Sequence, residues 1–553
     1  MELRREVLEK RFSGLKEEYD RYVPVWRELR DFVSPLRGFF YGDDPKVARR
    51  INSKTYLDDV TLEAAKVLAA GMQSGLTSKS LPWFELTLED PDLNDYGGVR
   101  EWLELVADRM RLVLAKSNMY DVFHNSYEEQ APFGTACYGL FDDYDDVIRG
   151  RSFTCGEYML GVSATGRVNL FGRRFAMSVE QMVEQFGLDN VSKSVKNMWD
   201  EHKLHTTVYV RHVIEPNDQR LPGLLDSRNM AYRSVYWEEA QTEDKFLRVS
   251  GFESFPIVGA RWNTVTTLQP YGVGPGHQIL SKAEMVQSLH RDKMAGLKYA
   301  IKPPLNVPAE LQRNGGVNLV PGGINYINNP DGRNVITPVY QAQVPLQDIR
   351  YEINELKNEV RSAFYVDMFL LSARSSDTQR TAREIAEKHE EKLLQLGPVI
   401  ERQESDSLTP VIQRTFQMMI KRGLFPPPPE ELENVEINVE YTSILAQAQR
   451  MVGVTAIEQF AGFIGGIGQT YPEVLDKFDY DKAADRYAAA VGVPKEIVRD
   501  GNEVDQLRQS RAEQQMQQQQ MMQAGQLVEG AKGLSQIDTG KNNALSALVN
   551  GMA

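Results

Sequence analysis

The stretch from Gly276 to Gly423 decides the fold. It holds a helical pattern, an insert bounded by prolines, a second helical pattern, the polar segment LSARSSDTQR (371–380) and a very long third helical pattern. The insert opens at Pro303-Pro304 and closes near Pro345. This order predicts two helices that carry an inserted tip and are joined through a loop to a third helix. We interpret the stretch as the wall of a pore, although a plain helical bundle satisfies the pattern alone.

The three helices have approximate bounds. The first spans about Gln278–Lys302, and the second spans about Leu346–Asp367 with one clean apolar stripe. The third runs from about Thr381 to Arg422, roughly 60 Å at about 1.5 Å per residue. Pro398 and Pro410 are expected to kink it twice, because each proline removes a helix hydrogen bond.

The residues before this stretch predict a mixed α/β body. Residues 1–33 carry a helical stripe that Pro24 is expected to bend or restart. Further expected elements are helices at 57–76, 98–117 and 178–186 (Ser178 as N-cap, Gly187 after the end), and strands at 83–88, 135–141, 153–175, 206–214, 233–238 and 257–262, with turns at 142–146 and 165–167. After the stretch we expect a strand at 435–441, helices at 443–463, 472–491 and 495–514, and a Gln-rich tail that is mobile or ordered only in an assembly.

Composition bounds the class of protein. The 553 residues are 42% hydrophobic and 25% charged, as in folded soluble proteins, and the net charge of −14 repels DNA and anionic lipid overall. Two cysteines give no disulfide framework, and a reducing compartment is the simpler interpretation. The N-terminus lacks a signal-peptide core, and no apolar run is long enough to span a membrane. The sequence predicts a soluble intracellular or particle-borne protein.

Sites for chemistry are weak in this chain. There is no Walker-type loop, and the glycines of 272–276 favour a tight strand-to-helix turn over a phosphate cradle. The acidic run 142–146 is typical of a solvated hairpin turn, since it lacks the EF-hand glycine and closing glutamate. His202 and His205 could share a helical face near His212, but no third zinc ligand is evident. Cys137 and Cys155 are expected to be small buried hydrophobes.

Several strings, in their order, carry a resemblance to a known family. They are the run from Trp26 to Pro35, AAGMQSGLTSKSLPWFELTL (69–88), APFGTACYGLF (131–141), GEYMLGVSATGRVNLFGRRF (156–175), YGVGPGHQILSKAEMVQSLHRDKMAGLKYAIKPPL (271–305) and RTAREIAEKHEEKLLQLGPVIERQESDSLTPVI (380–412). With them the chain resembles the portal proteins, or head-to-tail connectors, of short-tailed bacteriophages, over about residues 20–425.

The resemblance implies an α+β portal fold and a division of the chain. Its parts would be a mixed α/β wing (1–275), a stem helix (276–302), a small β-containing clip (303–345), a second stem helix (346–367), a tunnel loop (368–380), a long kinked wing helix with the following strand (381–442), a helical crown (443–512) and a flexible or assembly-ordered tail (513–553).

The resemblance also implies a function without chemistry of its own and without a cofactor. Twelve copies would form a ring at one capsid vertex, through which double-stranded DNA is packaged and later ejected. The partners would be terminase, the tail adaptor and tail proteins, and the major capsid and scaffolding proteins, with assembly in the host cytoplasm and no membrane.

Candidate residues follow from that division. The expected channel lining is Ser372, Arg374, Ser375, Ser376, Asp377, Gln379 and Arg380. Arg291, Lys298 and Lys302 lie within about 40° of one another on a helix, so they could graze DNA phosphates or pair with acids on a neighbouring subunit. Arg313, Asn314 and Arg333 are the clip candidates for partner docking. The alternatives are another ring-forming virion scaffold, or a metal-dependent nuclease that uses the 142–146 cluster.

Overall fold

The structure is a computed structural model. It describes residues 4–43, 55–90, 97–221, 223–224, 226–241, 245–308, 318–327, 337–338, 345–374, 395–432, 437–451, 454–468, 470–491, 498–499, 504 and 506–517. The chain divides into two compact units, Met1–Ala456 and Ile457–Ala553. Helices and strands are both abundant, so the predicted α+β class is confirmed.

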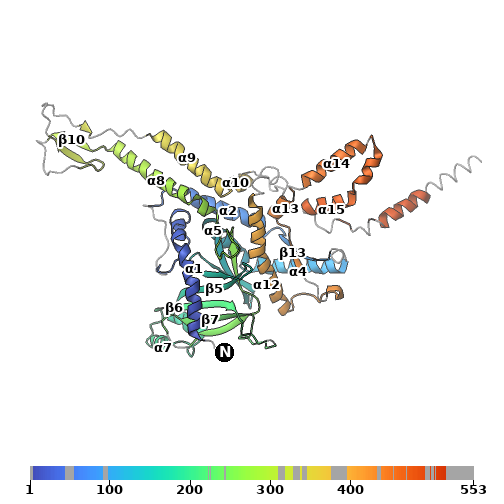
Figure 1. Ribbon diagram of the computed structural model, residues 1–553, viewed down its shortest axis with the longest axis horizontal. Helices are drawn as coiled ribbons and strands as arrows, with labels where there is room; N and C mark the ends of the chain where they lie inside the picture. The colour runs from blue at the N-terminus through green and yellow to red at the C-terminus, as the bar shows by residue number, and fades with distance from the viewer. Residues whose placement is uncertain are drawn as a thin grey trace, which may run out of the picture. The chain divides into compact units, whose positions relative to one another are not determined.

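A five-stranded antiparallel sheet forms one end of the first unit (Figure 1). Its spatial order is β4 (Met159–Val162), β5 (Val168–Ser178), β6 (Thr207–Pro216), β7 (Tyr232–Glu238) and β8 (Arg248–Phe252). Helix α6 (Val179–Phe186) follows β5 directly. Ser178 is its N-cap, as the sequence predicts, and it forms a capping box with Gln181. The helix then buries Val179, Met182 and Phe186 in a common apolar cluster with the sheet.

A second, three-stranded sheet joins this end to the helices. Strand β2 (Thr135–Asp143) pairs on one side with β3 (Val147–Phe153) and on the other with β9 (Ile257–Arg261). Helix α5 (Met119–Phe133) leads into β2 and packs against α2 (Val60–Leu76). Cys137 and Cys155 are buried, and burial raises the pKa of both thiols. The interpretation of both as small buried hydrophobes is confirmed.

Helix α1 (Arg5–Phe32) is continuous through Pro24, so the helix does not restart there. Aromatic packing holds the helix on both sides of the proline. The ring of Tyr22 lies 4.9 Å from that of Tyr271, and the ring of Trp26 lies 4.8 Å from it. These contacts offset the one hydrogen bond that the proline removes.

A two-stranded sheet joins distant parts of the chain. β1 (Phe84–Leu88) pairs antiparallel with β13 (Ile437–Tyr441), beside α4 (Gly97–Lys116). Both strands and the helix are predicted correctly from the sequence, but not the pairing. α13 (Ile444–Met451) follows and contacts α2.

The helix–insert–helix order of the central stretch is confirmed (Figure 1). α8 (Pro275–Ile301) leads to a small sheet in which β10 (Leu305–Pro308) lies between β11 (Ile324–Ile327) and β12 (Thr337–Pro338). α9 (Leu346–Ala363) then returns and packs against α8. We call the pair α8 and α9 the stem hairpin.

Two predicted boundaries after the stem are wrong. α9 ends at Ala363 rather than Asp367, because Tyr365 adopts φ +55° and breaks the helix. A new helix, α10 (Val366–Arg374), follows. Residues 368–374, which we assigned to a loop, are therefore helical, and only 375–380 of that segment lie outside the described residues.

The long third helix is described from residue 395 onward, and its predicted start at Thr381 lies outside the described residues. A π-helical turn at Glu404–Leu408 precedes α12 (Thr409–Lys421), and Pro410 lies in the first turn of α12. In a regular α-helix the N–H of residue 410 would donate to the carbonyl oxygen of Asp406, but proline has no N–H. The N–H of Thr409 donates to the carbonyl oxygen of Glu404, five residues earlier, as in a π-helix.

Beyond Ala456 most of the described residues are helical, as expected. α14 (Val454–Gly468) crosses the boundary between the units; a 3-10 turn at Pro472–Lys477 and α15 (Tyr480–Val491) follow. Residues 506–517 are helical, and the tail from 518 lies outside the described residues. Among the described residues, no helix is both long and apolar enough to cross a membrane.

Candidate functional site: the stem and its anchors

The stem begins in a turn whose glycines permit close backbone contact. A β-carbon on Gly274 would lie 2.6 Å from the carbonyl oxygen of Gln130, and one on Gly276 would lie 2.3 Å from that of Pro132. The Gly272 N–H donates to Thr135 Oγ1, and the Val273 N–H donates to the carbonyl oxygen of Asn263. These N–H groups hold the turn, so the tight strand-to-helix turn is confirmed and no phosphate cradle is formed by them.

A short segment before α2 ties both stem helices to the body. The Gln287 side chain on α8 accepts the N–H groups of Leu57 and Asp58 and donates to the Asp58 carbonyl oxygen at 2.7 Å. The Asp58 carboxylate lies 2.9 Å from His290 Nε2 on α8 and 2.5 Å from Lys357 Nζ on α9. Asp58 therefore connects α8 and α9 at one level of the stem hairpin. Nothing in the sequence pattern marked it, because its partners lie more than 200 residues away.

The chain beyond the stem is anchored on two glycines of α2. A β-carbon on Gly71 would lie 2.2 Å from the ring of Phe369 on α10, and one on Gly75 would lie 2.6 Å from Leu445 on α13. Their spacing of four places both glycines on one helix face. Because Phe369 packs on this face, α2 sets the position of α10, and from the end of α10 the chain continues into the segment expected to line the channel.

The predicted site residues fall partly outside the described chain. Ser372 and Arg374 lie in α10, whereas Ser375, Ser376, Asp377, Gln379 and Arg380 are not among the described residues. The clip candidates Arg313, Asn314 and Arg333 also lie outside them. On the stem, Arg291 and Lys298 are exposed on α8, and Lys302 caps its C-terminus.

Comparison with known proteins identifies the family. A family described as "Bacteriophage head to tail connecting protein" matches residues 5–498. The chain is 38% identical over 545 residues to a "Probable portal protein" of Bordetella phage BPP-1, covering 98% of this chain and 97% of the relative. It is also 38% identical over 550 residues to the "Portal protein" of Salmonella phage epsilon15, covering 99% and 98%. The chain belongs to the bacteriophage head-to-tail connecting protein family.

Among solved structures, a chain of a particle titled "Virion of native gene transfer agent (GTA) particle" matches with a TM-score of 0.36 and 10% identity. That match covers 79% of this connector and 90% of the other chain.

The long helix of this connector is fixed through its π-helical turn. Arg261 at the end of β9 donates from Nε and Nη2 to the two carboxylate oxygens of Asp406, at 2.8 and 3.0 Å. The side-chain amides of Gln403 and Gln130 pair with each other, at 2.6 and 3.0 Å. Tyr138 bonds Ser407 at 2.7 Å. The π-helical turn thus directs three polar side chains of the helix onto α5 and the three-stranded sheet.

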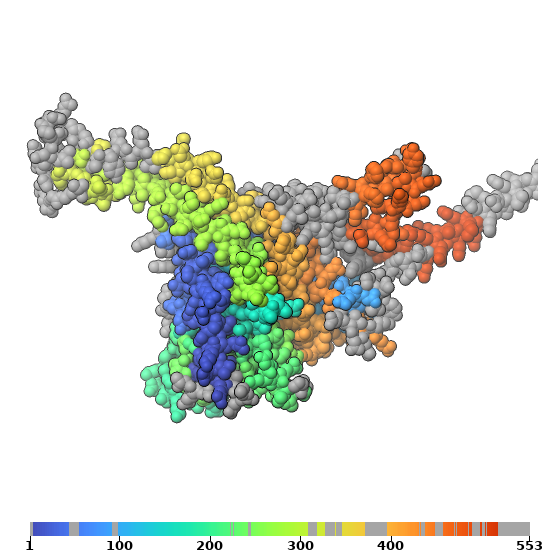
Figure 2. All heavy atoms as spheres, in the orientation of Figure 1, coloured from blue at the N-terminus to red at the C-terminus, as the bar shows by residue number. Residues whose placement is uncertain are grey.

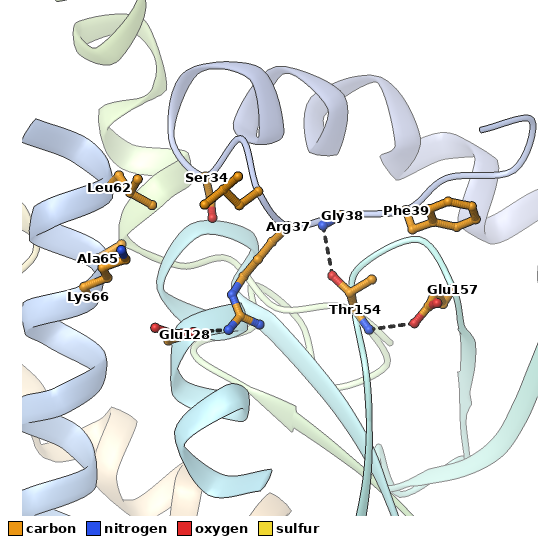
Figure 3. Close-up of a pocket in the computed structure, with 11 residues that line it drawn as sticks. Ser34, Arg37, Gly38, Phe39, Leu62, Ala65, Lys66, Glu128, Thr154 and Glu157 are labelled. Carbon is orange, nitrogen blue, oxygen red and sulfur yellow. Dashed lines mark hydrogen bonds and ion pairs between the residues drawn. The ribbon is translucent and has the colours of Figure 1, made fainter. Parts of the chain in front are cut away.

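A cavity of about 590 Å³ lies between the end of α1, α2 and the loop after β3 (Figure 3). Its charged groups are used internally: Arg37 pairs with Glu128 and, at 2.9 Å, with Glu129. The Gly38 N–H donates to Thr154 Oγ1. Burial raises the pKa of Glu157, whose carboxylate accepts the Thr154 N–H. These contacts hold loops together, and no nucleophile–base pair arises from them.

The structure also shows where each residue lies that the sequence suggested as a metal ligand. The acidic run is the β2–β3 turn, as predicted, and Asp143 accepts the N–H of Asp146 at 3.0 Å. His202 has φ +58° and lies with His205 in turns, so the idea of a shared helical face is wrong. His212 is buried on β6, where Nδ1 accepts from Arg173 and Nε2 contacts Ser234 Oγ. In the part of the chain that the structure describes, no three His, Cys, Asp or Glu side chains gather as a metal site would need.

Proposed function

We propose that this connector is a portal protein. Twelve copies form a ring at one capsid vertex, and double-stranded DNA is packaged and later ejected through its centre. The observation that carries the proposal is the stem hairpin with its small sheet at the tip and with α10 anchored beside its base (Figures 1 and 2). The names of the two phage relatives support it.

Each part of the stretch takes a role in this proposal. The stem hairpin surrounds the channel. The tip, residues 303–345, faces terminase during packaging and the tail adaptor afterwards, with Arg313, Asn314 and Arg333 as docking candidates. The segment after α10 faces the DNA with Ser375, Ser376, Asp377, Gln379 and Arg380, and Ser372 and Arg374 lie at the end of the helix that leads into it.

A conduit should hold DNA weakly. Each fixed contact between a cationic side chain and a phosphate adds affinity that must be broken at every step of translocation. A chain of net charge −14 with a serine-rich segment at the channel suits such a wall. The work of packaging then belongs to terminase, and this connector supplies passage and docking without chemistry of its own.

The remaining partners follow from the position at the head–tail junction. The wing would contact the major capsid protein and, during assembly in the host cytoplasm, the scaffolding protein. The helical region of the second unit would form the crown inside the head.

Deletion of Ser375–Gln379 tests the role of the segment after α10. α10 and its contact with Gly71 remain, so rings should assemble as in the wild type, while packaging or retention of DNA should fail. A matched control replaces the same five residues by Gly-Ser repeats of equal length, which separates segment length from side-chain identity. Rings that fail to form in the deletion would make the segment structural and contradict the assignment.

A further inference from the structure

The two stem helices carry exposed lines of opposite charge. On α8 the residues are spaced by seven and four, and on α9 by four, three and four, so each line stays within about 60° of one helix face. We call them the basic stripe (Arg291, Lys298, Lys302) and the acidic stripe (Asp348, Glu352, Glu355, Glu359). All seven residues are exposed. Within the described part of the chain, Glu359 alone of the seven forms an ion pair, at 2.6 Å to Lys282.

The two helices run antiparallel. Lys282 near the start of α8 pairs with Glu359 near the end of α9, and Asp58 bridges His290 and Lys357. Figure 1 shows α8 running outward to the small sheet and α9 returning beside it.

The stripes lie on opposite sides of this hairpin. Val286 marks the buried face of α8 and Leu356 that of α9. At about 100° per residue, the basic stripe lies about 120–160° ahead of Val286 along the chain, and the acidic stripe lies about 40–100° behind Leu356. The two helices run in opposite directions. Seen from one end of the hairpin, the forward offset on α8 and the backward offset on α9 are therefore rotations in the same sense. Since α8 and α9 pack against each other, offsets of the same sense carry the two stripes toward opposite sides of the hairpin. Lys282 supports this, because it lies about 180° from Arg291 and reaches the acidic side.

The charges also match in level along the stem. Asp58 places His290 and Lys357 at one level. The Lys282–Glu359 pair gives a register that differs by six residues. Midway between the two, Arg291 lies within about two residues, or about 3 Å, of the level of Glu355, and Lys298 within the same distance of the level of Asp348. The seven-residue step between the cations equals that between the anions. Cyclic symmetry about an axis along the stem keeps equivalent residues at equal levels, so neighbouring copies meet in this register.

We infer that the basic stripe of one copy docks on the acidic stripe of the next, with Arg291 beside Glu355 and Lys298 beside Asp348 of the partner. This rests on the ring of the proposed function. The contact joins two different faces, as a closed ring requires, and its complementary charges fix register and exclude wrong orientations. DNA phosphate is the other ligand for the basic stripe. It fits less well, because it would leave an equally long acidic stripe in the same register without a counterpart.

Charge reversal with mixing tests the inference in the full-length protein. Arg291→Glu/Lys298→Glu sets acids opposite Asp348 and Glu355, and Asp348→Lys/Glu355→Lys sets cations opposite Arg291 and Lys298. Each variant alone should give at least about tenfold fewer rings than wild type by negative stain and sedimentation, because like charges then face each other. An equimolar mixture should restore rings of alternating copies with an even subunit number. The matched control Arg291→Lys/Lys298→Arg keeps the charge and should assemble as wild type.

Three results would overturn the inference. One is ring formation by each reversed variant alone at wild-type levels. Another is failure of the mixture to form rings when both variants melt as folded proteins. The last is normal assembly of Arg291→Glu/Lys298→Glu with impaired DNA retention, which would assign the basic stripe to phosphate. Absence of rings in the wild type would instead contradict the proposed function itself.

Discussion

The ring of Phe369 on α10 occupies the space in which a β-carbon of Gly71 on α2 would stand, 2.2 Å from its nearest ring atom. Gly71→Ala should therefore displace α10 and the segment that follows it. We expect a loss of about 1–3 kcal/mol in the free energy of unfolding, typical of overpacking, together with reduced DNA packaging. Thermal unfolding and a packaging assay measure the two effects.

Gly14→Ala is the matched control. Gly14 also lies inside a helix, but an added β-carbon would meet nothing within 4 Å. That variant should gain about 0.5–1 kcal/mol, since alanine is the better helix former. Gly71→Ala/Phe369→Val should recover part of the loss, and equal stability of Gly71→Ala and wild type would show that α10 is not seated as described.

The ion pair between Arg261 and Asp406 makes a second prediction. The Arg261 side chain is 4% exposed, and its guanidinium meets both carboxylate oxygens. Asp406→Ala leaves a buried charge without its counterion and should cost about 3–5 kcal/mol. Ser405→Ala, at an exposed neighbouring position in the same π-helical turn, should change stability by less than about 0.5 kcal/mol. Chemical denaturation compares them, and equal midpoints would contradict this anchor.

Asp58 gives a third prediction. Asp58→Asn keeps the backbone bonds to Gln287 but removes the charge that His290 and Lys357 share. We expect a loss of about 1–3 kcal/mol and faster proteolysis of the stem hairpin, whereas Asp59→Asn at the exposed neighbouring position should match wild type. Limited proteolysis followed by mass spectrometry locates the cut sites. If the hairpin of Asp58→Asn were cleaved as slowly as that of wild type, the Asp58 carboxylate would not be what connects α8 and α9.

His212 predicts acid sensitivity. Burial, and then the nearby Arg173 and Arg151, hold the pKa of this imidazole well below its ordinary value, so the folded protein keeps it neutral. The unfolded chain takes up a proton as the pH falls through about 6.5. Stability from this group is therefore present above pH 6.5 and declines below it, by up to about 1.4 kcal/mol per pH unit.

The check is the melting temperature between pH 7 and 5. The melting temperature of His212→Gln should be lower than that of wild type at pH 7, but it should fall less steeply as the pH decreases. Parallel slopes for His212→Gln and wild type would contradict a neutral buried imidazole.

Elements with strong local signals could be predicted from the sequence. The Ser178 capping box, the alternating apolar residues of β1 and the helix–insert–helix order of the stem are all local patterns, and the structure has each of them. α5 lacks such signals: its N-cap Asn118 makes no cap and bonds Gly150 instead, and Pro132 lies in its last turn.

Long-range relationships could not be predicted in the same way. The pairing of β1 with β13 joins residues about 350 positions apart, and the bridge from Asp58 depends on three separate elements. Tyr365 ends α9 with a φ of +55°. Because this residue is not a glycine, the sequence gives no signal of the break. The acidic stripe on α9 was readable from its spacing, and it gains meaning only when the antiparallel hairpin places it opposite the basic stripe.

The central claim is that this connector forms a ring with a central passage. Negative-stain images of the purified full-length protein test it most directly. We predict end-on views of closed twelve-fold rings around a stain-filled hole. Compact monomers at all protein and salt concentrations would contradict the account.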